Sequence, residues 1–335
     1  MKAVKRVPVT LLTGFLGSGK TTLLRHLLAD ERMKRTAVII NEIGEIGLDH
    51  LLIGRLDEDT ILLKSGCVCC SVKTEFSETL KLLYQRAQTG LIPAFDRVIV
   101  ETTGMADPVP LLKLLLADES IAMLFSVQTV IATVDTLLPI NLAQQRMERI
   151  RQIAVADKII LTKTDLSNAF HQFIEGIRTL NDAAEIINGS DVEAVALSIF
   201  DREQYPVVRG LPNAQRFAYT TNQYRNVDQS PHQDVFSLCL YADQPLSWGN
   251  VSQFLQKLAR LYGPNLLRIK ALICVKESLR PIVLHGVQHY LFPETYLDAW
   301  PDDDHRSRIV LIFEGKLHQR IQVLFDEMVF EPINS

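Results

Sequence analysis

The stretch "GFLGSGKT", residues 14–21, decides the fold of this chain. It matches G-x-x-x-x-G-K-[ST] in full, follows an apolar run, and leads into "TTLLRHLL", whose leucines have helical spacing. Glycines at these positions let successive backbone N–H groups point into one concavity at a helix N-terminus, which suits a polyphosphate. The pattern predicts a phosphate-binding loop; the alternative is a glycine-rich turn that arose by chance.

Within this loop we expect Lys20 to reach the β- and γ-phosphates and Thr21 to place its hydroxyl on Mg²⁺. Backbone N–H groups supply the other contacts. The residues predicted to bind the nucleotide here are Gly14, Gly17, Ser18, Gly19, Lys20, Thr21 and Thr22.

Short β-branched runs alternate with helical segments as far as about residue 200. Several of these runs are too uniformly apolar for a strand with one solvated face. The alternation predicts an α/β fold, a P-loop NTPase with a doubly wound, mostly parallel sheet. The expected strands are residues 7–12, 37–41, 97–101, 129–134, 158–162 and 194–199, and one-sided helices are expected over 76–87 and 142–153.

A polar stretch rich in proline and glycine divides the chain. We expect a P-loop domain over 1–200, a linker over 201–230, and a smaller α+β domain over 231–335. An antiparallel sheet with two helices on one face fits the last part. The expected elements are strands near 235–241, 267–275, 281–289 and 308–313, a helix over 247–262, whose core face carries Trp248, Phe254, Leu255 and Leu258, and a closing helix.

Composition excludes several classes of protein. The formal charge of −4 over 335 residues, without a basic run, argues against nucleic-acid or membrane partners. Five cysteines, three of them nearly adjacent, do not make a secreted disulfide framework, which favours a reducing, cytoplasmic setting. No stretch approaches the roughly 18 apolar residues of a membrane span. We therefore expect small ligands or proteins as partners.

Two further motifs concern the nucleotide. In "ETTGMADP", Glu101 ends a buried strand and is predicted to hold the magnesium shell, while the N–H of Gly104 is predicted to meet the γ-phosphate. In "KIILTKTDL", the Asp165 carboxylate can accept two hydrogen bonds from guanine, and the stem of Lys163 can lie across the base. These residues favour GTP and GDP; solvated charges at a strand end are the alternative.

Three thiols crowd into "KSGCVCCSV", residues 64–72. Cys67, Cys69 and Cys70 can converge on one ion where an extended segment turns into a helix beginning near Thr74. Soft sulfur ligands favour Zn²⁺ or Cu⁺ over Mg²⁺, and three thiolates leave a fourth position open. A redox pair and simple packing are the alternatives, although adjacent cysteines make a strained disulfide.

Together, "GFLGSGKTTLLRHLL", "NEIGEIGLD", "SGCVCC", "ETTGMADP" and "LLTKTDL" resemble the CobW-type P-loop GTPases, particularly the YjiA-like branch. The resemblance covers nearly the whole chain. It implies a metal-homeostasis GTPase with a CobW C-terminal domain, acting as a metallochaperone or activator of metalloenzymes. It also implies that the C-x-C-C motif binds Zn²⁺ or a similar ion such as Co²⁺.

Other polar residues are weaker candidates. Glu42 and Glu45 lie where GTPases keep a switch, so either can join the magnesium shell or supply the missing zinc ligand; a solvated loop is the alternative. Ile40 stands where the YjiA-like branch can carry a further acidic residue, so an accessory metal site there is in doubt. The spacing of His285 and His289 suits a ligand pair on a helix, but the surrounding alternation favours a strand. Two further cysteines, Cys239 and Cys274, lie in apolar strands and suit small buried hydrophobes.

These observations predict a slow GTP hydrolase that uses Lys20, Thr21, Glu101 and Gly104. No arginine lies between Arg97 and Arg146, so an internal arginine finger, worth about 4–7 kcal/mol of barrier lowering, is not evident. The expected partners are GTP and a client metalloprotein, and a homodimer is left open. The alternatives are a nucleotide-dependent metal sensor without hydrolysis and a P-loop small-molecule kinase.

Overall fold

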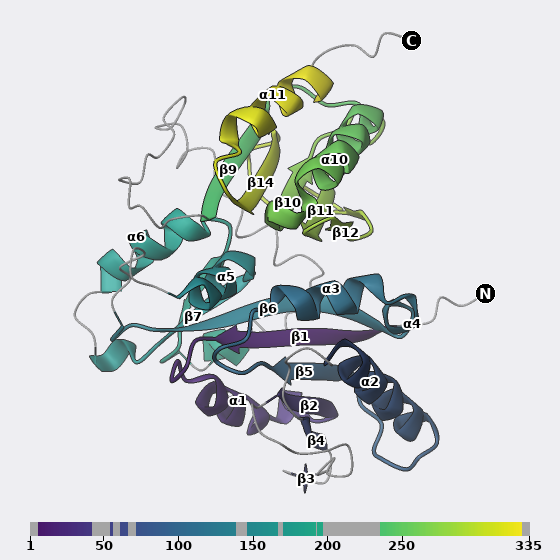
Figure 1. Ribbon diagram of the computed structural model, residues 1–335, viewed down its shortest axis with the longest axis vertical. Coiled ribbons are helices and arrows are strands. Elements are labelled where there is room, and N and C mark those ends of the chain that lie inside the picture. The colour runs from purple at the N-terminus through teal and green to yellow at the C-terminus, as the bar shows by residue number, and fades with distance from the viewer. Residues whose placement is uncertain are drawn as a thin grey trace.

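The computed structural model describes residues 6–41, 54–55, 61–65, 72–138, 146–166, 170–191, 193–196 and 235–329, which fold into two sheets with their helices (Figure 1). The first sheet has the order β3-β4-β2-β5-β1-β6-β7-β8 and is parallel except where β3 meets β4. Its strands are β1 (Val7–Gly14), β2 (Thr36–Asn41), β3 (Gly54–Arg55), β4 (Ile61–Ser65), β5 (Arg97–Glu101), β6 (Phe125–Asp135), β7 (Lys158–Thr162) and β8 (Glu185–Asn188).

Helices cover both faces of this sheet. Alternate residues of the strands form two separate cores, because successive side chains of a strand point to opposite faces. The first core includes α2 (Val72–Gln88), α3 (Val109–Ala117), α4 (Glu119–Ala122), α5 (Met147–Val155) and α6 (Phe170–Leu180), and the second includes α1 (Lys20–Leu28). The predicted doubly wound α/β fold is confirmed.

The strand order places the expected phosphate loop. β1 lies between β5 and β6, so the connections run in opposite directions on its two sides. In such sheets the crevice at the carboxyl ends of the strands, at this switch point, is where ligands bind. The "GFLGSGKT" loop begins at that end of β1.

The second sheet is antiparallel, in the order β12-β11-β10-β14-β9, with β13 on β11. Two helices cover one of its faces, as predicted, and the ring centroids of Phe254 and Phe325 lie 5.2 Å apart in that core. The elements are β9 (Val235–Ala242), α10 (Trp248–Tyr262), β10 (Leu266–Ile273), β11 (Ile282–Val287), β12 (Tyr290–Leu291), β13 (Thr295–Tyr296), β14 (Ser307–Glu314) and α11 (His318–Val329).

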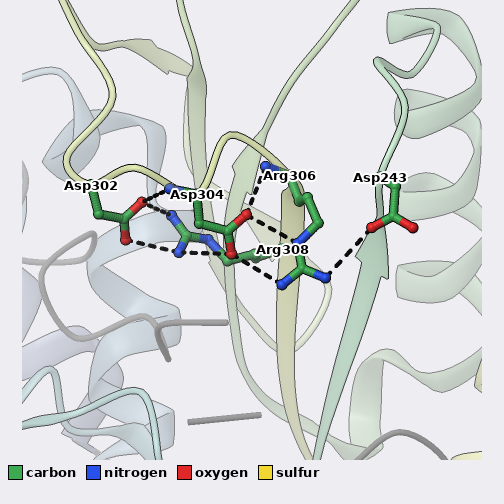
Figure 2. A network of polar contacts seen from close by, with 5 residues as sticks. All are labelled: Asp243, Asp302, Asp304, Arg306 and Arg308. Carbon is green, nitrogen blue, oxygen red and sulfur yellow. Dashed lines mark hydrogen bonds and ion pairs between the residues drawn. The ribbon is translucent and has the colours of Figure 1, made fainter. Parts of the chain in front are cut away.

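An acidic loop is fastened to the start of β14, as Figure 2 shows. The fully buried Arg308 donates from both terminal nitrogens to Asp302, at 2.9 and 3.1 Å. Arg306 binds Asp304 and reaches Asp243 at 3.5 Å beyond β9. Paired carboxylates and guanidinium groups of this kind fix one arrangement of the loop.

A buried charge cluster joins the two parts of the chain. Asp157, directly before β7, lies against Arg268 and Lys270 of β10, and none of the three is more than 3% exposed. The N–H of Val130 donates to Asp157 at 2.8 Å. Burial alone raises the pKa of Asp157, but the charges of Arg268 and Lys270 outweigh it and bring that pKa to about 2. The carboxylate is therefore held ionised between the two sheets.

The strand predicted over 194–199 is wrong in the part that the structure describes, and the strands β3, β4 and β8 were not predicted. Residues 193–196 are helical rather than extended, because the Asp191 carboxylate accepts the N–H of Ala194 and so starts a helix. The last strand is instead β8, four residues long. The strand β4 pairs parallel with β2. Among the described residues, no helix is both long and apolar enough to cross a bilayer.

Candidate functional site

The phosphate loop has the tight backbone that its glycines predict. Gly14, Gly17 and Gly19 have φ angles of 143°, 69° and 87°, a region that side chains with a Cβ rarely adopt. A Cβ on Gly14 would also lie 2.6 Å from the carbonyl oxygen of Thr133, on the neighbouring strand. Only glycine fits at this close approach. Gly19 caps α1, which begins at Lys20.

Lys20 folds back over the loop. Its Nζ donates to the carbonyl oxygens of Gly14 at 2.8 Å and Phe15 at 3.1 Å. Lys20 is 8% exposed, and its burial lowers the pKa of its ammonium group. The nearby charge of Glu101 raises this pKa but does not outweigh the effect of burial. The ammonium is thus held inside the loop, where an anion would relieve its desolvation.

Thr21 and Glu101 are brought together from segments 80 residues apart. The Thr21 hydroxyl donates to Glu101 Oε1 at 2.7 Å. Glu101 is 4% exposed at the end of β5, beside β1 in the sheet. Two hard oxygen donors side by side, next to an anion loop, fit the ligand preference of Mg²⁺. Thr22, the next residue of α1, is exposed.

The loop after β5 lies against the phosphate loop. A Cβ on Gly104 would lie 2.6 Å from the backbone nitrogen of Leu16, so the two backbones are in contact there. The carbonyl of Gly104 accepts a hydrogen bond from Gln152 Nε2 of α5 at 3.2 Å. Gly104 is therefore placed at the edge of the expected phosphate site.

Residues that the sequence analysis missed hold the phosphate loop from behind. The Ser18 and Thr133 hydroxyls share a hydrogen bond of 2.6 Å, and the Thr162 hydroxyl donates to the carbonyl of Ser18 at 2.8 Å. Thr133 lies two residues before the end of β6, and Thr162 is the last residue of β7. Thr162 is the first residue of the "TKTD" segment, and its place in this motif could have identified it from the sequence. Nothing in the sequence distinguishes Thr133.

The candidate base site follows β7. Lys163 has a φ of 57°, and its Nζ binds Asp135 Oδ2 at 2.5 Å. Asp165 is exposed in the short 3-10 turn Thr164–Leu166. Asp135, 6% exposed, fixes the direction of the lysine stem, a role that the sequence analysis did not assign. The Thr164 hydroxyl donates to Oδ1 of Asn188, the last residue of β8, at 2.7 Å.

The predicted zinc ligands, and the two glutamates named as further metal ligands, lie outside the described residues. These are Cys67, Cys69, Cys70, Glu42 and Glu45. What the structure gives is their flanks: β4 ends at Ser65 and α2 begins at Val72. Within the described ranges, no group of three potential ligand side chains gathers as a metal site would require.

Ser65 pairs with Asn41, and both strands point toward the edge of the sheet that carries the phosphate loop. β4 and β1 are three strand spacings apart, which corresponds to about 14 Å. Ser65, the last described residue before the C-x-C-C motif, therefore lies at the sheet edge that carries the phosphate loop.

The histidines and remaining cysteines of the second part behave as the simpler interpretation predicts. His285 lies in β11 and packs its ring 4.3 Å from that of Phe292, while His289 is exposed in the turn after the strand. Burial lowers the pKa of His285 to about 4. Cys239 lies in β9 and Cys274 directly after β10; both are partly buried and free, and burial raises the pKa of Cys239 to about 12. Neither thiol has the character of a metal ligand.

The glycine loop, the lysine inside it and its place at the switch point define a nucleotide-binding protein of the P-loop NTPase class. Residues 8–188 match the CobW/HypB/UreG nucleotide-binding domain, and residues 235–329 match the C-terminal domain of the cobalamin synthesis protein CobW. The chain belongs to this CobW/HypB/UreG family.

Similar proteins with established names agree with this placement. The chain is 30% identical over 307 residues to the zinc chaperone YjiA of Escherichia coli (strain K12), covering 91% of this chain and 93% of that protein. It is 36% identical over 191 residues to zinc-regulated GTPase metalloprotein activator 1 of Schizosaccharomyces pombe, covering 54% and 45%. The crystal structure of Zn(II)-bound YjiA GTPase from E. coli superimposes with a TM-score of 0.71 at 27% identity, covering 97% and 99% of the two chains.

Proposed function

We propose that this protein is a GTP-binding, slowly hydrolysing metallochaperone that delivers Zn²⁺, or a similar divalent ion such as Co²⁺, to a client metalloprotein. The observation that carries the proposal is the convergence of Lys20, Thr21 and Glu101 at the carboxyl end of β1. The zinc chaperone YjiA, similar over most of both chains, supports the choice of cargo.

The nucleotide half of the proposal assigns roles to the chain's own residues. Lys20 and the loop N–H groups bind the phosphates, and the N–H of Gly104 contacts the γ-phosphate. Thr21 and Glu101 hold Mg²⁺, which stabilises charge on the phosphate oxygens when bound. Asp165 reads the guanine edge. Lys163, fixed by Asp135, lies along the base.

The metal half assigns the cargo to Cys67, Cys69 and Cys70. Three thiolates leave one tetrahedral position open, which suits an ion that is to be released. The position of β4, which ends at Ser65 at the same sheet edge as the phosphate loop, supports this assignment. Thiolates need a reducing compartment, so we place the protein in the cytoplasm. We also assign residues 201–230 as the linker between its two domains.

Replacing Asp165 by asparagine tests the guanine assignment. The amide presents a donor where guanine also donates, so two hydrogen bonds to a charged group, worth about 1.5–3 kcal/mol each, are lost. We expect GTP affinity to fall by about 10²- to 10⁴-fold and affinity for xanthosine triphosphate to rise. Equilibrium titration with fluorescent analogues of both nucleotides measures this change in nucleotide preference.

The matched control is Asp303→Asn, the same change at an exposed position of the C-terminal domain. It should leave both affinities unchanged. GTP binding by the Asp165→Asn variant equal to that of the unmodified protein would overturn the guanine assignment.

A further inference from the structure

Gln152 of α5 is committed to the loop that contains Gly104. Its Nε2 donates to the carbonyl oxygens of Gly104 at 3.2 Å and Ala106 at 2.9 Å. The side chain is 1% exposed, and its Oε1 accepts no hydrogen bond from the described residues. The buried amide of Gln152 is therefore held by two hydrogen bonds to the same loop. Any displacement of the loop leaves the buried amide without its hydrogen-bond acceptors, which is unfavourable.

Arg151, the preceding residue, joins the same loop to the C-terminal domain. Its Nη1 lies 2.6 Å from Asp107 Oδ2, three residues after Gly104. Its Nε lies 2.7 Å from Glu314 Oε1, at the end of β14. The two carboxylates belong to different domains and bind different nitrogens of one guanidinium. One side chain therefore bridges the loop after β5 and the second sheet.

The setting of this bridge favours a specific geometry. The side chains of Arg151, Asp107 and Glu314 are 32%, 23% and 21% exposed, so all three are largely withdrawn from water. The hydrogen bond to Glu314 raises the pKa of Arg151, which stays charged. The planar guanidinium fixes the direction of both bonds at once, unlike a lysine ammonium. β14 lies between β10 and β9, so the bridge ends on an inner strand.

Holding the domains together does not require this bridge. The Asp157 cluster already joins β10 to the first domain, and its members are no more than 3% exposed. What the bridge adds is contact with the loop after β5, which approaches the phosphate loop through Gly104 and Leu16. Figure 1 shows α5 between the first sheet and the C-terminal domain.

We propose that Arg151 and Gln152 are positioning residues that couple the γ-phosphate to the C-terminal domain: they hold the 104–107 loop against the phosphate loop, and Glu314 sets their position. The coupling rests on the proposed function, because it takes Gly104 as the contact of the γ-phosphate. A partner that binds the C-terminal domain and moves β14 therefore changes the affinity of the protein for GTP. By linkage, GTP changes the affinity of the protein for that partner by the same factor.

Replacing Glu314 by glutamine tests the coupling at a residue remote from the nucleotide. We expect the affinity for a non-hydrolysable GTP analogue to fall by about 5-fold or more, the lower end of usual allosteric couplings, while GDP affinity stays within 2-fold. Arg151→Gln should give the same split, and the double variant should be no weaker than Arg151→Gln alone, since both remove one bridge. Calorimetric titration of the full-length variants measures all of these affinities.

Asp243→Asn is the matched control, because it removes one negative charge from a carboxylate that pairs with an arginine in the same domain (Figure 2). It should leave the ratio of GTP-analogue to GDP affinity unchanged. Arg151→Lys keeps the positive charge but loses the two-sided guanidinium. Its ratio of GTP-analogue to GDP affinity should lie between those of the unmodified protein and Arg151→Gln. This variant serves as the test if Glu314→Gln does not fold.

An equal loss for both nucleotides, or no loss, would overturn the coupling while leaving the proposed function intact. Failure of the unmodified protein to bind either nucleotide would instead remove the proposed function.

Discussion

Replacing Asp157 by asparagine is expected to lower the free energy of unfolding by about 3–5 kcal/mol, the usual cost of breaking a buried ion pair from one side. The variant leaves Arg268 and Lys270 buried between the two sheets without their counter-charge. Burial lowers the pKa of Lys270 to about 8, so the charged form of this lysine is disfavoured even with Asp157 beside it. Urea unfolding at pH 7, followed by circular dichroism, measures the difference.

Acid should remove this difference. The pKa of Asp157 is lowered to about 2 from the usual value of 3.8, so the stabilisation that it supplies is complete above the pKa of the unfolded state and is lost as pH falls through the pKa of the folded state. The unmodified protein and the variant should therefore converge as pH approaches 2. Asp298→Asn, at a side chain 97% exposed, should change stability by less than about 0.5 kcal/mol. A loss no larger than that in Asp157→Asn would contradict the account.

Replacing Gly104 by alanine is expected to reduce kcat/KM for GTP hydrolysis by about 10²-fold, the effect of displacing a catalytic contact by about 1 Å. The added Cβ would lie 2.6 Å from the Leu16 nitrogen and 2.7 Å from its Cα, so one of two backbones must move. Either movement separates the Gly104 N–H from the γ-phosphate. Release of inorganic phosphate under saturating Mg²⁺ measures the rate.

Gly249→Ala is the control for this change. In α10, the added Cβ would meet nothing closer than Ser247 Oγ at 3.6 Å, so it should leave hydrolysis unchanged. Gly249 is the second residue of α10, where alanine can adopt the backbone, so the change should stabilise the protein by about 0.4–1 kcal/mol. Hydrolysis by Gly104→Ala at the rate of this control would mean that Gly104 does not position the phosphate.

The parts of the site that follow from local sequence were predictable. The phosphate loop, Glu101 at the end of β5 and the "TKTD" segment after β7 each depend on a short motif beside an apolar strand. Strand 194–199 was mistaken because an apolar run suits either a strand or a buried helix, and the Asp191 cap decided between them.

The supporting contacts could not be found in the same way. Thr133 meets Ser18 across 115 residues, and Arg151 meets Glu314 across 163. In the sequence both are ordinary polar residues of a strand and a helix. Their roles arise only when the sheet order places β6 beside β1 and α5 beneath the second sheet. Such contacts depend on topology, which no local pattern encodes.

GTP is expected to control zinc binding at Cys67, Cys69 and Cys70, which follow β4, a strand about 14 Å from β1 in the sheet. Zinc affinity measured by competition with a chelator, for the protein loaded with Mg²⁺ and either a GTP analogue or GDP, tests it most directly. We expect the two affinities to differ by about 5-fold or more. Replacing the three cysteines by serine should abolish stoichiometric zinc binding and leave nucleotide affinity unchanged. Equal zinc affinity in the two nucleotide states would contradict the account.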